Sequence, residues 1–223
     1  MNLTALQTKL QYSFNDTELL KLALTHKSYA KTNNERMEFL GDAVLGYVVA
    51  KILYAMDDAY NEDDMSLARA HLVRGSTLAE IARELSLGEA LRMGTGELKS
   101  GGRDRGSILA DALEAVIGAV HTDGGITASE RLVSMLWTSR LELLGSVDLK
   151  DAKTKLQEIL QADQRALPVY QVVDVDGADH ARSYLVSCTL DDGTHVQAKQ
   201  SSRRKAEKDA AQLMLKQLGV DDD

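Results

Sequence analysis

The chain has 223 residues, 44% of them hydrophobic, and a formal net charge of −8. This length and composition fit one or two soluble domains with sizeable cores and exclude a disordered protein. The single cysteine, Cys188, excludes an intrachain disulfide and is expected to be a buried strand residue. The N-terminus lacks a signal-peptide pattern and no window of about 18 residues is uninterruptedly apolar, so we expect a soluble, unsecreted protein without a membrane span.

The chain opens with two short predicted helices. Leu3, Leu6 and Leu10 have the spacing of one apolar helix face. Asp16 is a suitable N-cap for a second helix, which carries leucines as far as Leu24. Both patterns indicate amphipathic helices that pack on a core.

An apolar run over residues 34–56 predicts a long helix with carboxylates in it. One predicted core stripe consists of Met37, Leu40, Val44 and Val48. Glu38 and Asp42 lie one turn apart on the neighbouring stripe, where the helix is expected to enter the core. Because like charges at this spacing cost about 0.2–0.5 kcal/mol even when exposed, we expect a cation between them.

The next region is predicted to be helical with long connections. An acidic loop over 57–64 precedes helices at about 65–75 and 76–87. Residues 94–106 contain five glycines together with lysine and arginine, which predicts a flexible basic loop. As a phosphate cradle this loop is a weak candidate, because no strand precedes it and none is expected before residue 168.

A second carboxylate-bearing helix is predicted over residues 107–120. Asp111 and Glu114 are three positions apart, so they share a face that is surrounded by aliphatic residues. A capping-box pattern at 127–130 predicts that another helix follows, as far as Leu144.

Four acidic residues on two core helices form a plausible cage for hard divalent cations. Oxygen ligands favour magnesium or manganese, whereas zinc prefers the His and Cys ligands that neither stretch offers close by. For either acidic pair alone, the better interpretation would be a solvated surface. Two pairs embedded in apolar sequence favour a metal site.

The sequence pattern changes near residues 145–148. A helix is predicted at about 151–161, followed by strands at about 169–176, 183–190 and 194–199 and a helix at about 202–218. Aspartate–glycine pairs at 176–177 and 192–193 are hairpin-turn signals between these strands. The order predicts a small α-β-β-β-α domain.

The last predicted helix begins with a cluster of positive charge. Ser202 can cap it, and Arg203, Arg204 and Lys205 occupy its first turn. Cations at a helix N-terminus oppose the helix dipole, so helix stability does not explain them, whereas binding of an anion does. The alternative interpretation is a solvated run of charge.

These motifs resemble two known families. Residues 34–45, and 94–102 followed by 108–111, resemble the two characteristic stretches of ribonuclease III. Residues 150–218 resemble the double-stranded RNA-binding domain. The resemblance covers nearly the whole chain and implies an all-α endonuclease domain (1–145), a linker (146–150) and a small α+β RNA-binding domain (151–223).

The resemblance implies roles for the four acids. It places Glu38, Asp42, Asp111 and Glu114 at the family's metal-binding positions, with Asp42 and Glu114 also catalytic because they orient the attacking water. Mg²⁺ would be the cofactor, with Mn²⁺ able to substitute. The expected products carry 5′-phosphate and 3′-hydroxyl ends with a short 3′ overhang.

The resemblance also implies how the RNA is held. The expected RNA-binding residues are Thr154, Gln157, Glu158, His180, Ser202, Arg203, Arg204 and Lys205. The first four match minor-groove contacts, where 2′-hydroxyls mark RNA, and the last four match phosphate contacts. One departure is the sequence at 198–200, Ala-Lys-Gln, where the family usually has glycines. By the same resemblance, the endonuclease domain is expected to work as a homodimer with Phe39 at the interface.

The implied partners are double-stranded RNAs, namely ribosomal RNA precursors and structured messenger RNAs, in the cytoplasm.

Three alternatives to an endonuclease for double-stranded RNA remain. A non-cleaving RNA-binding regulator would not need four caged acids, a non-nucleolytic ribosomal relative would be expected to lose one of them, and a helical phosphohydrolase for small nucleotides would not need the cations at 203–205.

Overall fold

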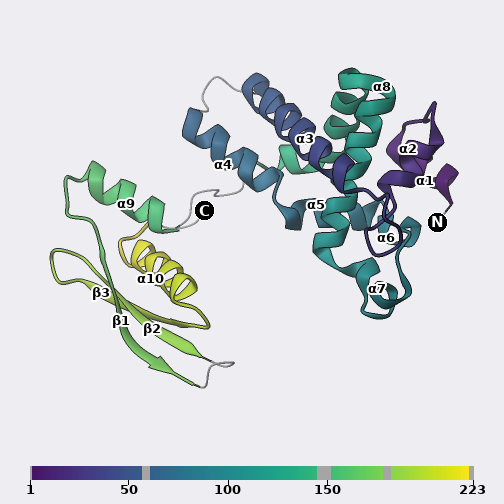
Figure 1. The fold of residues 1–223 in the computed structure, drawn as a ribbon. Helices are drawn as coiled ribbons and strands as arrows, with labels where there is room; N and C mark the ends of the chain where they lie inside the picture. Colours follow the sequence, from purple (N-terminus) through teal and green to yellow (C-terminus); the bar gives the residue numbers. More distant parts are fainter. Residues whose placement is uncertain (1, 57–60, 145–151, 178–181, 221–223) are drawn as a thin grey trace. The chain divides into compact units, whose positions relative to one another are not determined.

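In the computed structural model, the chain divides into two compact units, Met1–Val147 and Asp148–Asp223 (Figure 1). The structure describes residues 2–56, 61–144, 152–177 and 182–220. In its described parts the first unit is helical and the second has the order helix, three strands, helix. The predicted fold class is therefore confirmed. The predicted linker, 146–150, lies outside the described residues.

The first unit is built from helices of very different length. Their bounds are α1 (Leu3–Leu10), α2 (Thr17–Ala23), α3 (Glu35–Met56), α4 (Glu62–Leu72), α5 (Gly75–Glu84), α6 (Leu87–Ala90), α7 (Thr95–Lys99), the 3-10 helix η1 (Gly102–Asp104) and α8 (Gly106–Glu142). The predicted loop at 94–106 is thus partly helical. One isolated parallel bridge, outside any strand, joins Thr25 to Arg92.

Helices α3 and α8 lie side by side at the centre of the first unit. Val44, Val48 and Val49 of α3 are buried, as are most residues of α8 between Ile108 and Val120. The predicted core stripe of α3 is wrong at its start, because Leu40 is 36% exposed and Met37 is only half-buried. The N-terminal end of α3 therefore presents apolar side chains to its surroundings.

Helix α8 bends at Gly125, whose φ of 72° is left-handed. The helical residues beyond this break, as far as Glu142, form a second helical segment, in agreement with the helix predicted from the pattern at 127–130. Glu130 of the expected capping box accepts a hydrogen bond from Lys51 of α3 at 2.6 Å. Further along α8, the buried Trp137 donates from Nε1 to the carbonyl of Leu72 at 3.0 Å, which ties α8 to the end of α4.

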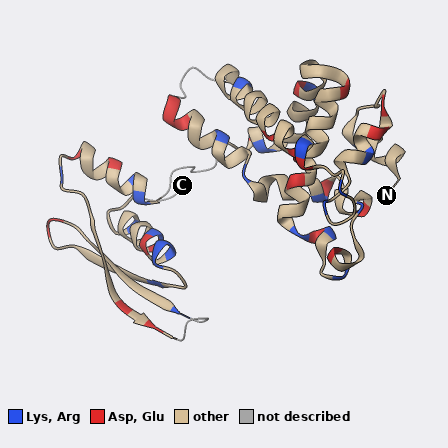
Figure 2. Ribbon diagram, viewed as in Figure 1, with Lys and Arg blue, Asp and Glu red and all other residues tan. Residues whose placement is uncertain are grey.

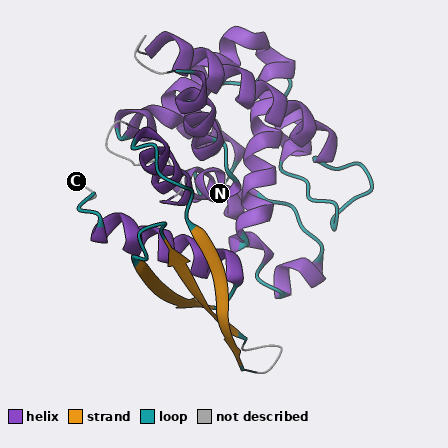
Figure 3. Cartoon of the chain, turned by 90° about the vertical axis from the view of Figure 1, so that its left-hand side faces the viewer, coloured by secondary structure: helices purple, strands orange, loops and turns teal. Residues whose placement is uncertain are grey.

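The second unit is a three-stranded sheet covered on one face by two helices (Figure 3). Its elements are α9 (Ala152–Ala162), β1 (Val169–Asp176), β2 (Ser183–Thr189), β3 (His195–Gln200) and α10 (Arg203–Gln217). The strands are antiparallel in the order β1-β2-β3, with a register shift in β1 between Val172 and Asp174. Cys188 is buried against Leu156 and Met214, as predicted.

Candidate metal centre and nucleic-acid interface

Two glycines allow the backbones of α3 and α8 to approach closely. A Cβ atom on Gly41 would overlap the carbonyl oxygen of Glu114, and one on Gly118 would overlap the carbonyl oxygen of Met37. Only residues without a side chain fit at this crossing. The crossing places the acidic residues of α3 against those of α8. The sequence predicts that these acids form a cage, but not the glycine contacts that bring them together.

Three of the four predicted acids meet at this crossing. Glu38, Asp111 and Glu114 are half-buried, and one carboxylate oxygen from each lies within 4.8 Å of the others. Asp42 is exposed on α3 and is not a member of this cluster, although its charge acts on Glu114. The expectation that Asp42 enters the core is therefore wrong.

The environment of the cluster opposes negative charge. Burial raises the pKa of Glu114 to about 7, with further contributions from the charges of Asp42, Asp111 and Glu38. Burial is also the main cause of the raised pKa of Glu38, followed by the charge of Asp111. Burial likewise raises the pKa of Asp111. A cation bound among these oxygens would relieve this repulsion.

Lys27 and His26 supply positive charge beside the cluster. Their charges lower the pKa of Asp111 against the effect of burial, and Lys27 does the same for Glu38. Lys27 donates to Glu35 at 3.2 Å, in the first turn of α3. Lys27, in the loop before α3, is therefore a cation that acts on Glu38, one of the two acids for which the sequence predicts a cationic neighbour. The sequence pattern does not place Lys27 near the acids, because its neighbours depend on how that loop folds back.

Hydrogen bonds hold this loop in place. The amide of Asn34 donates to the carbonyl of Thr25 at 2.9 Å, which fixes the entry to α3. The amide of Gly94 donates to Ser28 Oγ at 3.0 Å, and Ser28 Oγ lies 2.7 Å from His26 Nδ1. The glycine-rich segment and the start of α3 are thus tied to the same short stretch.

The donor set of the cluster fits a hard divalent cation. Ligand oxygens at about 2.1 Å from an octahedral magnesium ion lie about 3–4.2 Å from one another, a spacing that three carboxylates within 4.8 Å can reach with small side-chain adjustments. All three ligands are oxygens, which magnesium and manganese prefer. The fourth acid, Asp42, stands one turn along α3 from Glu38.

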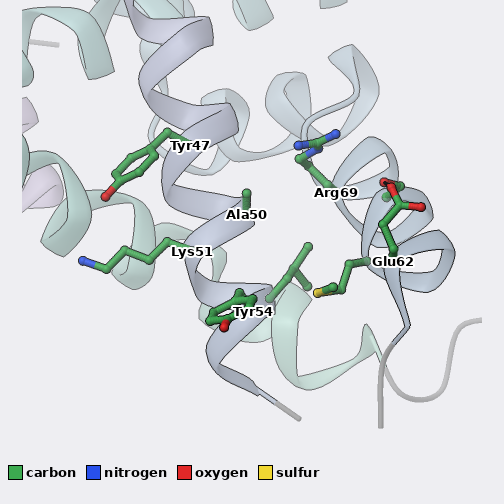
Figure 4. Close-up of a pocket in the computed structure, with 9 residues that line it drawn as sticks. Tyr47, Ala50, Lys51, Tyr54, Glu62 and Arg69 are labelled. Carbon is green, nitrogen blue, oxygen red and sulfur yellow. Dashed lines mark hydrogen bonds between the residues drawn. The ribbon is translucent and has the colours of Figure 1, made fainter. Parts of the chain in front are cut away.

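Helix α3 exposes several aromatic side chains. Phe39 is 81% exposed, and Tyr47 and Tyr54 are also mostly exposed. Near the second half of α3 a cavity of about 410 Å³ opens between α3 and α4 (Figure 4). Its lining residues are Tyr47, Ala50, Lys51, Leu53, Tyr54, Glu62, Met65, Ser66 and Arg69.

Among the described helices, α3 alone passes the length and hydropathy criteria for a membrane span. Core helices of soluble proteins meet the same criteria. Because α3 packs along α8 and carries Glu38 into the acidic cluster, we interpret it as a helix of the folded first unit.

In the second unit, the predicted phosphate-binding residues lie at the start of α10. Ser202 is the N-cap, and its Oγ accepts from the amide of Lys205 at 3.3 Å. Arg203, Arg204 and Lys205 are exposed. Figure 2 shows Lys and Arg on both helices of this unit.

The other predicted RNA contacts are only partly described. Thr154 and Glu158 are exposed on α9 and Gln157 is half-buried, while His180 lies outside the described residues. At the unusual 198–200 sequence, Ala198 joins the core, Lys199 pairs with Asp176 at 3.2 Å and Gln200 donates to Asp209 at 2.7 Å. The residues that replace the family's glycines therefore belong to a regular strand.

Comparisons with known proteins agree with this architecture. Residues 16–141 match the family described as Ribonuclease-III-like, and residues 152–218 match the double-stranded RNA binding motif. A Ribonuclease 3 from Vibrio vulnificus is 50% identical over 215 residues, which are 96% of each chain. One from Nitrosococcus oceani is 52% identical over 211 residues, covering 93% of this chain and 91% of the relative.

A solved structure resembles the first unit. The nuclease domain of ribonuclease III from Campylobacter jejuni has a TM-score of 0.62 and 43% sequence identity, covering 63% of this chain and 99% of that one. That structure is described as showing flexibility in a region involved in dimer formation. With an acidic cluster in a helical unit, an α-β-β-β-α unit that follows in the sequence and these relatives along nearly its full length, the chain belongs to the ribonuclease III family of double-stranded RNA endonucleases.

Proposed function

We propose that this protein is a magnesium-dependent, homodimeric endonuclease that cuts double-stranded RNA and leaves 5′-phosphate and 3′-hydroxyl ends with a short 3′ overhang. The observation that carries the proposal is the meeting of Glu38, Asp111 and Glu114 where α3 crosses α8. An RNA-binding domain without catalysis would not need half-buried acids whose pKa values are raised by burial and by one another's charge. In this proposal residues 1–145 cut, 146–150 link and 151–223 bind RNA.

Four carboxylates share the work at the metal centre. Glu38 and Asp111 mainly hold the cation, while Asp42 and Glu114 hold it and orient the attacking water in line with the leaving 3′-oxygen. When bound, magnesium lowers the pKa of a coordinated water and offsets negative charge on the phosphate and the leaving oxygen. The exposure of Asp42 supports a position between the cluster and the solvent from which RNA arrives.

The second unit grips the RNA from two places. Exposed Arg203, Arg204 and Lys205 lie beside the free amides at the start of α10, where a phosphate is favoured by charge and by the helix dipole. Thr154, Gln157 and Glu158 on α9, together with His180, are proposed to contact minor-groove edges and 2′-hydroxyls. Contacts to phosphates and 2′-hydroxyls do not depend on the base sequence, which fits a protein that recognises duplex shape.

We propose that two copies pair through the apolar face of α3. Phe39 lies near one end of that helix, and the cavity beside Tyr47 and Tyr54 lies toward the other end. A two-fold axis across the middle of α3 would bring Phe39 of one copy toward the cavity of the partner subunit. Such an interface would remove exposed aromatic side chains from water and would give one catalytic centre for each RNA strand.

The proposed substrates and cellular compartment follow from membership of the family. We propose that the protein acts in the cytoplasm on ribosomal RNA precursors and structured messenger RNAs, where double-helical segments are long enough to be gripped. A non-cleaving RNA-binding regulator is the alternative, and the acidic cluster argues against it.

The test is cleavage of a long perfect RNA duplex by the purified protein in magnesium, manganese, calcium or EDTA. We expect cutting in magnesium and manganese, none in EDTA, and RNA binding without cutting in calcium, because calcium coordinates loosely and lowers the pKa of bound water less. Full activity in EDTA would refute the metal centre. Binding without cutting under every condition would favour the regulator.

A further inference from the structure

We infer that Glu207 is a positioning residue that aims the guanidinium group of Arg203 at an RNA phosphate. The inference rests on the proposed phosphate-binding role of Arg203. Glu207 is an acid on the first turns of the helix that is proposed to bind a polyanion, a place where electrostatics alone would disfavour a carboxylate. The contacts of Glu207 with neighbouring cations explain a carboxylate at this position.

Glu207 holds two cations from two helices. One carboxylate oxygen lies 2.7 Å from Arg203 Nε, one turn earlier on α10, and the other lies 2.8 Å from Lys153 Nζ on α9. The side chain of Glu207 is only 13% exposed, whereas that of Arg203 is 65% exposed. Both hydrogen bonds from these cations lower the pKa of Glu207, the bond from Lys153 most strongly. Glu207 is therefore ionised and largely buried.

Lys153, the second partner of Glu207, contacts the sheet. Lys153 Nζ lies 4.5 Å from the centre of the Tyr170 ring, and Tyr170 of β1 packs against the domain core. A continuous set of contacts thus runs from β1 through α9 to the first turn of α10. It sets the position of Glu207 before any ligand arrives.

The geometry at Arg203 leaves its phosphate-binding atoms available. Arg203 bonds Glu207 through Nε, and its two terminal amino groups make no hydrogen bond to any residue within the described ranges. Those two groups form the fork that binds a phosphate with two parallel hydrogen bonds. Because Glu207 already restricts the arginine rotamer, less conformational entropy is lost when the phosphate binds.

A double-mutant cycle separates positioning from simple charge and from folding. RNA affinity is measured with the full chain in calcium, on one perfect duplex, for wild type, Glu207→Ala, Arg203→Ala and the double variant, with the RNA checked for cleavage. Removing an acid near the RNA should tighten binding if charge alone matters. If Glu207 positions Arg203, then Glu207→Ala should weaken binding about 3- to 10-fold, a coupling typical of contacting residues.

The effect of Glu207→Ala in the Arg203→Ala background distinguishes positioning of Arg203 from an effect of charge or folding. In the Arg203→Ala background, Glu207→Ala should leave affinity unchanged or improve it. Equal weakening in both backgrounds, or tighter binding in the wild-type background, would overturn the inference. If Arg203→Ala alone did not weaken binding, the proposed role of Arg203 would fail first and the positioning role with it.

Two further variants control for folding and for charge. Glu207→Gln keeps an oxygen that can accept from Arg203, so it should bind RNA no more than about 2-fold more weakly than wild type even if its melting temperature falls. Asp209→Ala removes another acid of α10, one that accepts from Gln200 at 2.7 Å. It should not weaken binding. Weakening by Asp209→Ala as large as that by Glu207→Ala would also count against a specific role for Glu207.

Discussion

The carbonyl oxygen of Glu114 lies against the α-carbon of Gly41, so closely that no side chain fits between the two helices. This contact fixes the distance between α3 and α8 at the level of the acidic cluster. The carboxylates of Glu38 and Glu114 meet because the backbones that carry them touch.

Enlarging Gly41 should therefore damage both stability and activity. In Gly41→Ala, the new methyl group must push α3 away from α8, which should cost about 1–3 kcal/mol of unfolding free energy and reduce cleavage. Gly75→Ala is the matched control, since Gly75 is the first residue of α5 and a Cβ there meets nothing within 4 Å. It should change the unfolding free energy by less than about 1 kcal/mol and leave cleavage intact. Denaturant melts and initial rates compare the two, and a Gly41 variant as stable and active as wild type would contradict the close contact.

The pH dependence of the metal-free protein should follow Glu114. Its pKa is raised from 4.5 to about 7 in the folded state, so the folded protein binds more protons than the unfolded chain between these values. The stabilising contribution is present below about pH 4.5 and is lost as the pH rises through about 7.

Magnesium binding should depend on the same group. Magnesium must displace the proton of Glu114, so the magnesium affinity should weaken as the pH falls below about 7. Calorimetry at several pH values checks the pH dependence of the stability and of the magnesium affinity. Glu114→Gln, whose side chain does not titrate, is the control.

Truncating Phe39 should weaken pairing of the two copies. Phe39→Ala removes the most exposed large apolar side chain on α3, and we expect the dimer dissociation constant to rise about 30-fold or more. Ile126→Ala, another exposed apolar side chain of the same unit, should have no effect. Sedimentation should show wild type near twice 24.4 kDa at micromolar concentration. A monomeric wild type, or equal effects of the two variants, would contradict pairing through α3.

Arg203→Ala should weaken RNA binding without slowing the chemical step. Loss of one phosphate contact should reduce affinity similarly for all duplex sequences and lower the salt slope by about 1. Lys216→Ala, in the last turn of the same helix, is the control and should leave the slope unchanged. Binding isotherms at several salt concentrations provide the measurement. A sequence-dependent loss would show that Arg203 contacts bases.

Local patterns were enough to predict most elements but not all of the site. The α9 to α10 order followed from a change of period and from turn residues, and the acids of α3 and α8 followed from their helical spacing. That Glu38, Asp111 and Glu114 meet depends on the glycine crossing, and that Lys27 lies beside them depends on a folded-back loop. Such relations are tertiary, so helical periodicity does not contain them.

The predictions for Leu40 and for the basic loop differ from the structure for separate reasons. The spacing predicts Leu40 in the core, but it is 36% exposed on α3, where we propose that a partner subunit covers it. The glycines at 94–106 predict an irregular loop, yet the segment contains α7 and η1. Glu97 pairs there with Arg105 at 2.8 Å and packs beside Gly102, contacts that order the segment.

Single-turnover cleavage by Glu114→Gln tests the central claim most directly. The substitution keeps the side-chain volume and removes the charge that is proposed to hold the metal and orient the attacking water, so at saturating magnesium and RNA the rate should fall by about 10³-fold or more. Duplex RNA affinity in calcium should change by less than about 2-fold, because the proposed RNA grip is in the second unit. A Glu114→Gln enzyme that cuts within about 10-fold of the wild-type rate would contradict the assignment of the catalytic centre to the acidic cluster between α3 and α8.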